Sequence, residues 1–91
     1  MVSQKVLVTE PAGLHLRPAG KLCEISLMYQ SKIQIQKGTH IPNAKSVLGV
    51  LAARVQQGDE IEIICDGSDE DAALMALVQL MQEGFNKEET L

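Results

Sequence analysis

The chain has 91 residues, enough for one small domain, and 45% of them are apolar although it holds only one Phe, one Tyr and no Trp. Its core must therefore be aliphatic. The net charge of −4 argues against nucleic acid as a partner, because phosphate contacts need clustered Lys and Arg. No apolar run approaches the ~20 residues that span a bilayer, and the sequence does not begin with a signal-peptide pattern, so we expect a cytoplasmic protein without membrane insertion.

The first half of the chain predicts a strand, a helix and two further strands. Alternating apolar and polar residues predict a strand over 2–9, and Pro and Gly make 10–14 a loop. Apolar residues recur at three- and four-residue spacing from 16 to about 28, which is typical of a helix with one buried face. Clean alternation predicts a strand over 32–37, and a glycine then provides a hairpin turn into a short strand at 39–42.

The second half predicts a short helix, a strand and a final helix. The short helix covers 46–53 and the strand covers 60–65. We expect Ser68, with an acidic residue three positions later, to open the last helix as a weak capping box, and Gly84 to end it. The charged segment 86–91 is expected to be frayed. Strands with one apolar face, alternating with helices that cover it, predict a single two-layer α+β domain over the whole chain.

The two cysteines do not form a recognisable site. Cys23 and Cys65 are far apart, with no CxxC motif and no cluster of His and Cys around them. Each falls on an apolar face, so we expect both to be buried as small hydrophobic side chains without a disulfide. We expect no metal and no cofactor.

The clearest chemical signal is the segment Gly13-Leu14-His15-Leu16-Arg17-Pro18-Ala19. Pro18 is tolerated in the first turn of a helix, because the N–H that it lacks would be unpaired there. The first N–H groups of that helix, at Leu16 and Arg17, point back toward His15 and, with the helix dipole, favour an anion. The Arg17 side chain adds a planar fork of donors suited to phosphoryl oxygens. His15 is therefore a candidate for carrying a phosphoryl group, although a histidine at a helix start, taken alone, is more often solvated or only a cap.

This segment resembles the active-site segment of the HPr family, the histidine-containing phosphocarriers of the bacterial sugar phosphotransferase system. A second block, Asn43-Ala44-Lys45-Ser46-Val47-Leu48-Gly49-Val50-Leu51, is similar to the regulatory-serine segment of that family. The spacing between the two blocks agrees with that family, and the resemblance covers the chain from Val2 to about Phe85. It implies an α+β two-layer open-faced sandwich, in which three helices cover one face of a four-stranded antiparallel sheet, in the order βαββαβα.

The resemblance implies a phosphoryl carrier that is not itself an enzyme. His15 would receive the group on its Nδ1 atom from Enzyme I, which draws it from phosphoenolpyruvate, and pass it to the IIA domains of sugar permeases. The backbone N–H groups of Leu16 and Arg17, with the Arg17 side chain as a clamp, would hold the phosphoryl oxygens. We expect the chain to work as a monomer.

Ser46 has two interpretations. It can cap the helix that follows it, which is the commoner use of a serine at such a position. By resemblance it is instead a regulatory serine. An ATP-dependent kinase would phosphorylate it, and the phosphorylase activity of the same enzyme would remove the phosphate. In relatives that use this regulation, the phosphoserine slows sugar transport and promotes binding to a catabolite-control repressor.

Val47, Leu48 and Leu51 lie on a helix too short to bury them all, so we expect some of them to be exposed. With Leu16 they would form a patch for partner proteins beside His15, although they could also simply close the core.

Three residues depart from the usual pattern of the family. Leu16 is bulkier than the Ala or Thr that usually follows the histidine, and Glu24 and Leu27 stand where many HPr proteins have lysines. A specialised or regulatory member of the family therefore stays open, serving nitrogen control, dihydroxyacetone phosphorylation or carbon catabolite control. An enzyme or metal site built from His15 and His40 is disfavoured, because neither histidine has an acid–base partner in view.

Overall fold

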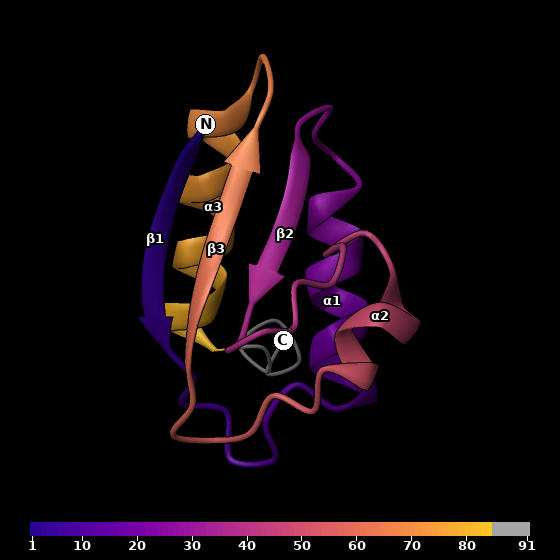
Figure 1. Cartoon of the computed structure of the whole chain (residues 1–91). Helices are drawn as coiled ribbons and strands as arrows, with labels where there is room; N and C mark the ends of the chain where they lie inside the picture. Colours follow the sequence, from indigo (N-terminus) through magenta and orange to yellow (C-terminus); the bar gives the residue numbers. More distant parts are fainter. Residues whose placement is uncertain (85–91) are drawn as a thin grey trace, which may run out of the picture.

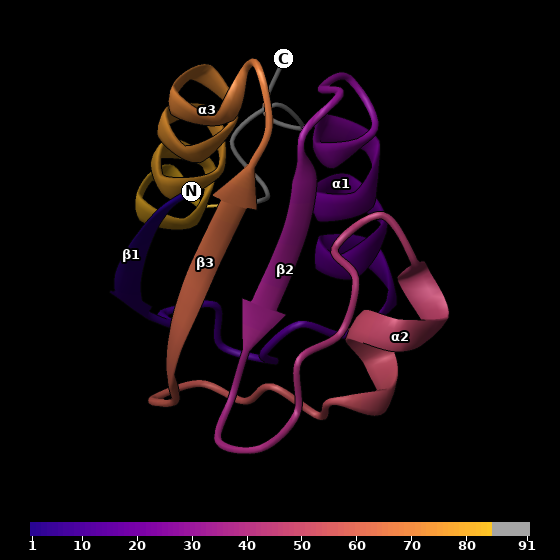
Figure 2. The same cartoon turned by 45° about the horizontal axis from the view of Figure 1, so that its top comes forward.

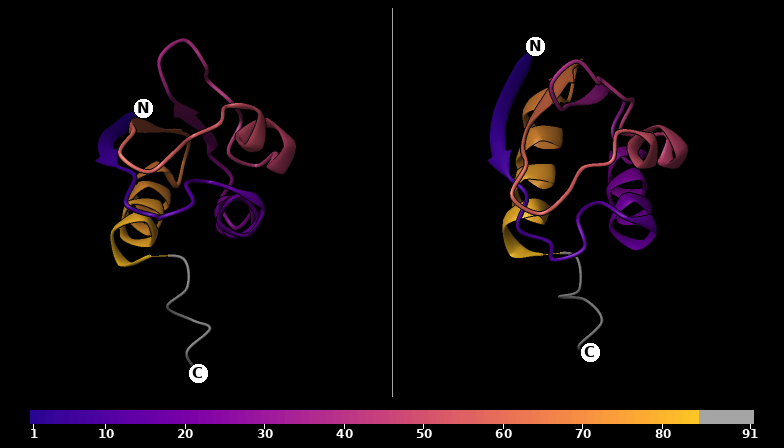
Figure 3. Two further views of the ribbon diagram at one scale, coloured as in Figure 1. Left: turned by 90° about the horizontal axis from the view of Figure 1, so that it is seen from below. Right: turned by 60° about the horizontal axis from the view of Figure 1, so that its bottom comes forward.

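The computed structural model describes residues 1–84, so the expectation for 86–91 lies outside the described residues. Three strands and three helices follow one another as Figure 1 shows: β1 Val2–Leu7, α1 Leu16–Ser26, β2 Lys32–Gln36, α2 Val47–Ala52, β3 Glu60–Asp66 and α3 Glu70–Glu83. In the view from below, α1 and α3 lie on the same side of the sheet (Figure 3). The short helix α2 packs beside α1 (Figure 2). The structure is thus the α+β open-faced sandwich that the sequence predicts.

The sheet has β3 at its centre, with β1 and β2 antiparallel to it on either side. Val6 of β1 lies opposite Ile61, and Ile35 of β2 lies opposite Ile63, so the apolar side chains of the three strands share one face. α1 and α3 cover this face, and the side chains there are buried. The opposite face carries polar side chains such as Glu62, and none of the helices within residues 1–84 covers it.

The predicted strand over 39–42 is wrong as a continuous strand. The segment does run antiparallel to β2, since Lys37 and His40 exchange two backbone hydrogen bonds of 2.9 Å. Farther along, the N–H of Ile35 donates to the carbonyl of Pro42 at 3.1 Å. Pro42 has no N–H with which to return that bond, so the ladder is interrupted and only isolated bridges remain. The fourth strand is therefore reduced to an irregular edge segment.

The core is aliphatic, as expected. Leu22 of α1 and Leu77 of α3 are both fully buried against the sheet. Cys23 and Cys65 are buried and do not form a disulfide, as predicted. Burial raises the pKa of the Cys65 thiol to about 11, so this side chain behaves as a small hydrophobic group. Over residues 1–84, every helix is too short or too polar to cross a membrane.

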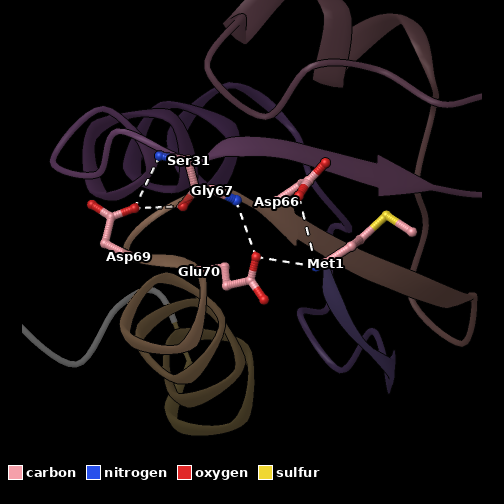
Figure 4. Close-up of polar contacts among 6 residues, drawn as sticks. All are labelled: Met1, Ser31, Asp66, Gly67, Asp69 and Glu70. Atoms are coloured by element: carbon pink, nitrogen blue, oxygen red, sulfur yellow. Dashed lines mark hydrogen bonds and ion pairs between the residues drawn. The ribbon is translucent and has the colours of Figure 1, made fainter.

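The start of α3 differs from the prediction, because Asp69 rather than Ser68 is its N-cap residue. The Asp69 carboxylate does not cap the helix. It accepts hydrogen bonds from the N–H groups of Gln30 at 2.8 Å and Ser31 at 2.9 Å, and from the Ser31 hydroxyl (Figure 4). A Cβ on Gly67 would lie 2.6 Å from the Cα of Ser31, so only glycine lets the two segments come this close.

The two carboxylates at the start of α3 are both held in their ionised form. The Ser31 hydroxyl is the main cause that lowers the pKa of Asp69, followed by the Gln30 N–H. The Gly67 N–H, at 3.1 Å, is the main cause that lowers the pKa of Glu70, which also pairs with the amine of Met1 at 3.1 Å (Figure 4). Through Asp69, the loop before β2 is tied to the start of α3 at this end of the sheet.

Asp69→Asn should lower the Tm at neutral pH, because an amide accepts the three hydrogen bonds less well than a carboxylate. The folded-state pKa of Asp69 lies below its unfolded value, so its contribution is present above about pH 4 and is lost as the pH falls through the folded pKa. Thermal unfolding followed by circular dichroism should therefore show the difference between wild type and variant shrinking in acid.

Asp71→Asn is the matched control, since Asp71 also lies in the first turn of α3 but makes no hydrogen bond or ion pair among residues 1–84. An equal loss in Asp71→Asn, or a loss in Asp69→Asn that does not change with pH, would contradict this account.

Candidate functional site

His15 is exposed, but its backbone is anchored on both sides. It is the N-cap residue of α1, with an extended backbone (φ −79°, ψ −166°), and its side chain makes no capping hydrogen bond. Leu14 before it is 3% exposed, and Pro18 and Ala19 after it are fully buried. The imidazole therefore projects into solvent from a backbone that the core holds in place.

The start of α1 provides donors next to this imidazole. The first hydrogen bond at this end of the helix runs from the N–H of Ala19 to the carbonyl of His15 at 2.9 Å. The N–H groups of Leu16 and Arg17 lie ahead of that bond, at the end of the helix where the dipole is positive. The Arg17 side chain is exposed in the same turn. An anion beside His15 would thus meet two backbone donors and a guanidinium.

The loop before His15 rests on the segment that follows α2. The N–H of Leu14 donates to the carbonyl of Val55 at 2.9 Å. Gly13 has a positive φ of 70°, and a Cβ there would lie 2.3 Å from the same carbonyl oxygen and 2.8 Å from the Cα of Gln56. Only glycine allows this approach, so Gly13 sets the position from which His15 projects. The sequence motif includes this glycine but gives no sign of its partner segment.

A second set of contacts fixes the segment after α2. The Nζ of Lys37 donates to the carbonyl of Arg54 at 2.7 Å and lies 2.9 Å from Oδ2 of Asp59. The N–H of Gln56, at 2.8 Å from the same oxygen, is the main cause that lowers the pKa of Asp59, and Lys37 adds to it. Arg54 itself has a φ of 53°, which costs a non-glycine residue about 1 kcal/mol. A positive φ at a residue other than glycine leaves no periodic pattern in the sequence, so the sequence alone does not single out Arg54.

Ser46 caps α2, as one of its two interpretations predicts. Its Oγ accepts a hydrogen bond from the N–H of Gly49 at 3.1 Å, and its carbonyl accepts from Val50 at 3.0 Å. Ser46 is half-buried, and the hydrogen bond to its hydroxyl oxygen is partly buried as well. Capping and modification use the same oxygen atom, and the cap does not exclude modification.

Four apolar side chains lie at the start of α1 and along α2, and we call them the apolar patch: Leu16, Val47, Leu48 and Leu51. Leu48 is 79% exposed and Leu16 is 66% exposed, which confirms that the short helix leaves apolar surface in solvent. Val47 and Leu51 are half-buried and pack against the core, so they also help to close it. α2 lies beside the first turns of α1 in the views of Figures 1 and 2.

The outer side of α1 carries little net positive charge. The Nζ of Lys21 lies 3.4 Å from Oε1 of Glu24, and Leu27 in the turn that follows the helix is 63% exposed. His40 lies in the hairpin after β2, where its backbone pairs with Lys37. Among residues 1–84 no group of three or more His, Cys, Asp or Glu side chains could hold a metal ion.

Comparison with known proteins gives a consistent result. A family model described as "PTS HPr component phosphorylation site" matches residues 2–83. Phosphocarrier protein HPr of Treponema pallidum is 40% identical over 97% of this chain and 100% of that protein. HPr-like protein Crh of Bacillus subtilis is 36% identical over 91% of this chain and 98% of that protein. The crystal structure of HPr from Thermoanaerobacter tengcongensis has a TM-score of 0.92 at 31% identity, over 96% of this chain and 98% of that one.

Gly13→Ala should destabilise the protein by about 2–4 kcal/mol, because the new methyl group would have to displace the backbone at Val55 as well as adopt a positive φ. Gly38→Ala is the control, since Gly38 has a φ of 58° with nothing within 4 Å of an added Cβ. It should lose only about 1–2 kcal/mol. Urea unfolding of both variants measures the difference, and equal losses would show that the contact with Val55 has no special weight.

Proposed function

Because the chain belongs to the HPr family of phosphocarrier proteins, we propose that His15 accepts a phosphoryl group from Enzyme I and passes it to the IIA domains of sugar permeases, in the cytoplasm. The observation that carries this proposal is the exposed imidazole at the start of α1, with buried anchors on both sides and Arg17 in the same turn. A side chain that meets two proteins in turn must be exposed. A group that it carries between them needs donors held in fixed positions.

The proposed transfer needs no base from this chain. The lone pair of a neutral His15 ring nitrogen, Nδ1 by resemblance, forms a bond to phosphorus while the bond between phosphorus and the donor atom breaks. The other ring nitrogen keeps its proton. The N–H groups of Leu16 and Arg17 and the Arg17 guanidinium would face the phosphoryl oxygens.

In the second step a nucleophile of the acceptor protein attacks phosphorus, and His15 leaves as neutral imidazole. The chain is then a stoichiometric carrier rather than an enzyme, and each partner completes the reacting centre by positioning. All the groups named come from one copy of the chain, so a monomer would suffice.

Ser46 is the proposed regulatory position, phosphorylated by an ATP-dependent kinase and restored by a phosphorylase activity. A phosphate oxygen could take over the hydrogen bond that the hydroxyl now accepts from Gly49. The added charge would lie directly before Val47 and Leu48 of the apolar patch, where it would oppose an acidic partner. The same charge would offer a catabolite-control repressor a feature to recognise.

A specialised or regulatory role within the family is the second candidate, and the outer side of α1 favours it. Lys21 is paired with Glu24 at 3.4 Å. Leu27 exposes apolar surface at a place where a positively charged side chain would attract an acidic partner. A surface with so little net positive charge attracts an acidic partner weakly. The carrier would then serve nitrogen control, dihydroxyacetone phosphorylation or carbon catabolite control instead of general sugar uptake.

His15→Ala should abolish phosphorylation by Enzyme I and phosphoenolpyruvate, whereas His40→Ala should leave it intact. Intact mass should show one added phosphoryl group on wild type, lost in acid and retained in base, as expected for a phosphohistidine. An adduct of the same kind on His15→Ala would refute the assignment of the acceptor.

Ser46→Asp should slow the phosphorylation of His15, whereas Ser46→Asn should not. Both side chains can cap α2, so the two variants differ mainly in one negative charge next to the apolar patch. Initial rates at limiting Enzyme I measure the effect, with the Tm of each variant as a check on folding. If Asp and Asn give the same rate, Ser46 acts only as a cap.

Glu24→Lys should raise the rate of association with an Enzyme I from a standard sugar system by about two- to fivefold at low salt. The change removes the contact between Lys21 and Glu24 and adds a cation on the outer side of α1. The gain should shrink as salt rises, because the attraction is screened, while the maximum transfer rate stays the same. Asp71→Lys, an equal change of charge at the start of α3, is the control. No gain, or the same gain in both variants, would remove the support for a specialised partner.

A further inference from the structure

Arg54 combines a strained backbone with a side chain that has no partner among residues 1–84. It is the only residue other than glycine with a positive φ in this part of the chain. Its side chain is exposed, and its guanidinium makes no hydrogen bond or ion pair with any described residue. Strained backbone conformations persist where the surroundings enforce them, and they concentrate at functional sites.

The backbone of Arg54 is held firmly from two sides. Its N–H donates to the carbonyl of Leu51 at 3.1 Å, and its carbonyl accepts from the Nζ of Lys37 at 2.7 Å. The charge of Lys37 is balanced by Asp59 at 2.9 Å. The positive charge of Arg54 has no such balance, so at this place the structure fixes the backbone and leaves the guanidinium to solvent.

A backbone contact brings the segment that holds Arg54 against the segment that leads to His15. Gly13 lies against Val55 and Gln56, and the N–H of Leu14 bonds to the carbonyl of Val55, so the two segments pass each other in opposite directions. One further step along each segment brings the chain to His15 on one side and to Arg54 on the other. Both segments run along the lower edge of the molecule in Figure 1 and lie near each other in the views of Figure 3.

We propose that Arg54 is a specificity-determining residue that binds a carboxylate on the protein partner that exchanges the phosphoryl group with His15. This inference rests on the proposed function. Arg17 lies in the first turn of α1 and would face the phosphoryl oxygens, whereas Arg54 lies just beyond the end of α2. A guanidinium there pairs with a planar carboxylate through two parallel hydrogen bonds.

The charge on α1 supports a partner contact at Arg54. Lys21 and Glu24 form an ion pair on α1, so that side of the site offers little attraction to an acidic surface. Arg54 supplies an uncompensated positive charge just after α2, the helix that carries exposed Leu48 and half-buried Leu51. Apolar surface with an adjacent arginine is typical of protein interfaces.

The simplest alternative is that Arg54 only complements the negative end of the α2 dipole. Arg54→Asn and Arg54→Gly distinguish the two hypotheses, because Asn and Gly both tolerate a positive φ but carry no charge. If the charge served stability, the Tm would fall in both variants. If it serves docking, the Tm stays or rises and only the interaction with the partner weakens.

The test measures Enzyme I association with wild type, Arg54→Asn, Arg54→Gly and Arg54→Lys, by the initial rate of His15 phosphorylation and by calorimetric titration. We expect the two neutral variants to lose about three- to tenfold in association rate and affinity at low salt, with a smaller loss at high salt and an unchanged rate at saturation. Arg54→Lys should recover part of the loss. Lys32→Gln is the control, because it removes an exposed charge at the first residue of β2, the end of that strand remote from the start of α1 (Figure 1).

The inference would be overturned if Lys32→Gln lost as much association rate and affinity as the neutral Arg54 variants. It would also be overturned if the neutral Arg54 variants lost none. A shorter lifetime of phosphorylated His15 in isolated Arg54→Asn with normal association would overturn it as well, since Arg54 would then contact the phosphoryl group and not a partner carboxylate. Failure of the proposed function gives a different result. Wild type would then not be phosphorylated on His15 at all. The calorimetric titrations would still compare the affinities of wild type and the Arg54 variants for Enzyme I.

Discussion

The backbone contact between Gly13–Leu14 and Val55–Gln56 holds the functional end of the molecule together. One carbonyl, that of Val55, accepts the N–H of Leu14 and lies where a side chain on Gly13 would otherwise be. The contact joins the loop that enters α1 to the segment that leaves α2. His15 follows one side of this contact, and α2 and Arg54 come directly before the other, so the contact joins the two separate parts of the chain that carry them.

This arrangement lets the site be exposed without making the fold weak. A carrier has to present its histidine to two proteins in turn, so the imidazole itself contributes nothing to the burial of apolar surface. Stability comes instead from the aliphatic core between the sheet and the helices, and from the carboxylates at the start of α3. These carboxylates lie at the opposite end of the sheet from the start of α1 (Figures 1 and 4). Exposed Leu16 and Leu48 can then serve partner proteins while the fold is maintained elsewhere.

Two differences between expectation and structure have the same physical origin. Pro42 interrupts the fourth strand because a missing N–H breaks a ladder that the alternation of side chains alone would extend. Asp69 replaces Ser68 as the N-cap of α3 because its carboxylate has better partners in the loop at Gln30 and Ser31. In both cases a residue's position in the sheet or beside a distant loop outweighs its local propensity. Periodicity places an element within a few residues, and hydrogen-bond partners decide where it begins and ends.

The sequence by itself determined the features that depend on near neighbours. The apolar faces of the strands and helices follow from periodicity, and the place of His15, Leu16 and Arg17 at a helix start follows from the proline in the first turn. The cap at Ser46 is likewise a local property. Only the tertiary structure decided that Gly13 rests on Val55, that Ser31 is bound by Asp69, and that Arg54 adopts a positive φ. Each of these depends on residues far apart in the chain, and their contact is fixed only when the sheet and helices pack together. Short-range propensities carry no record of which distant backbone groups will meet.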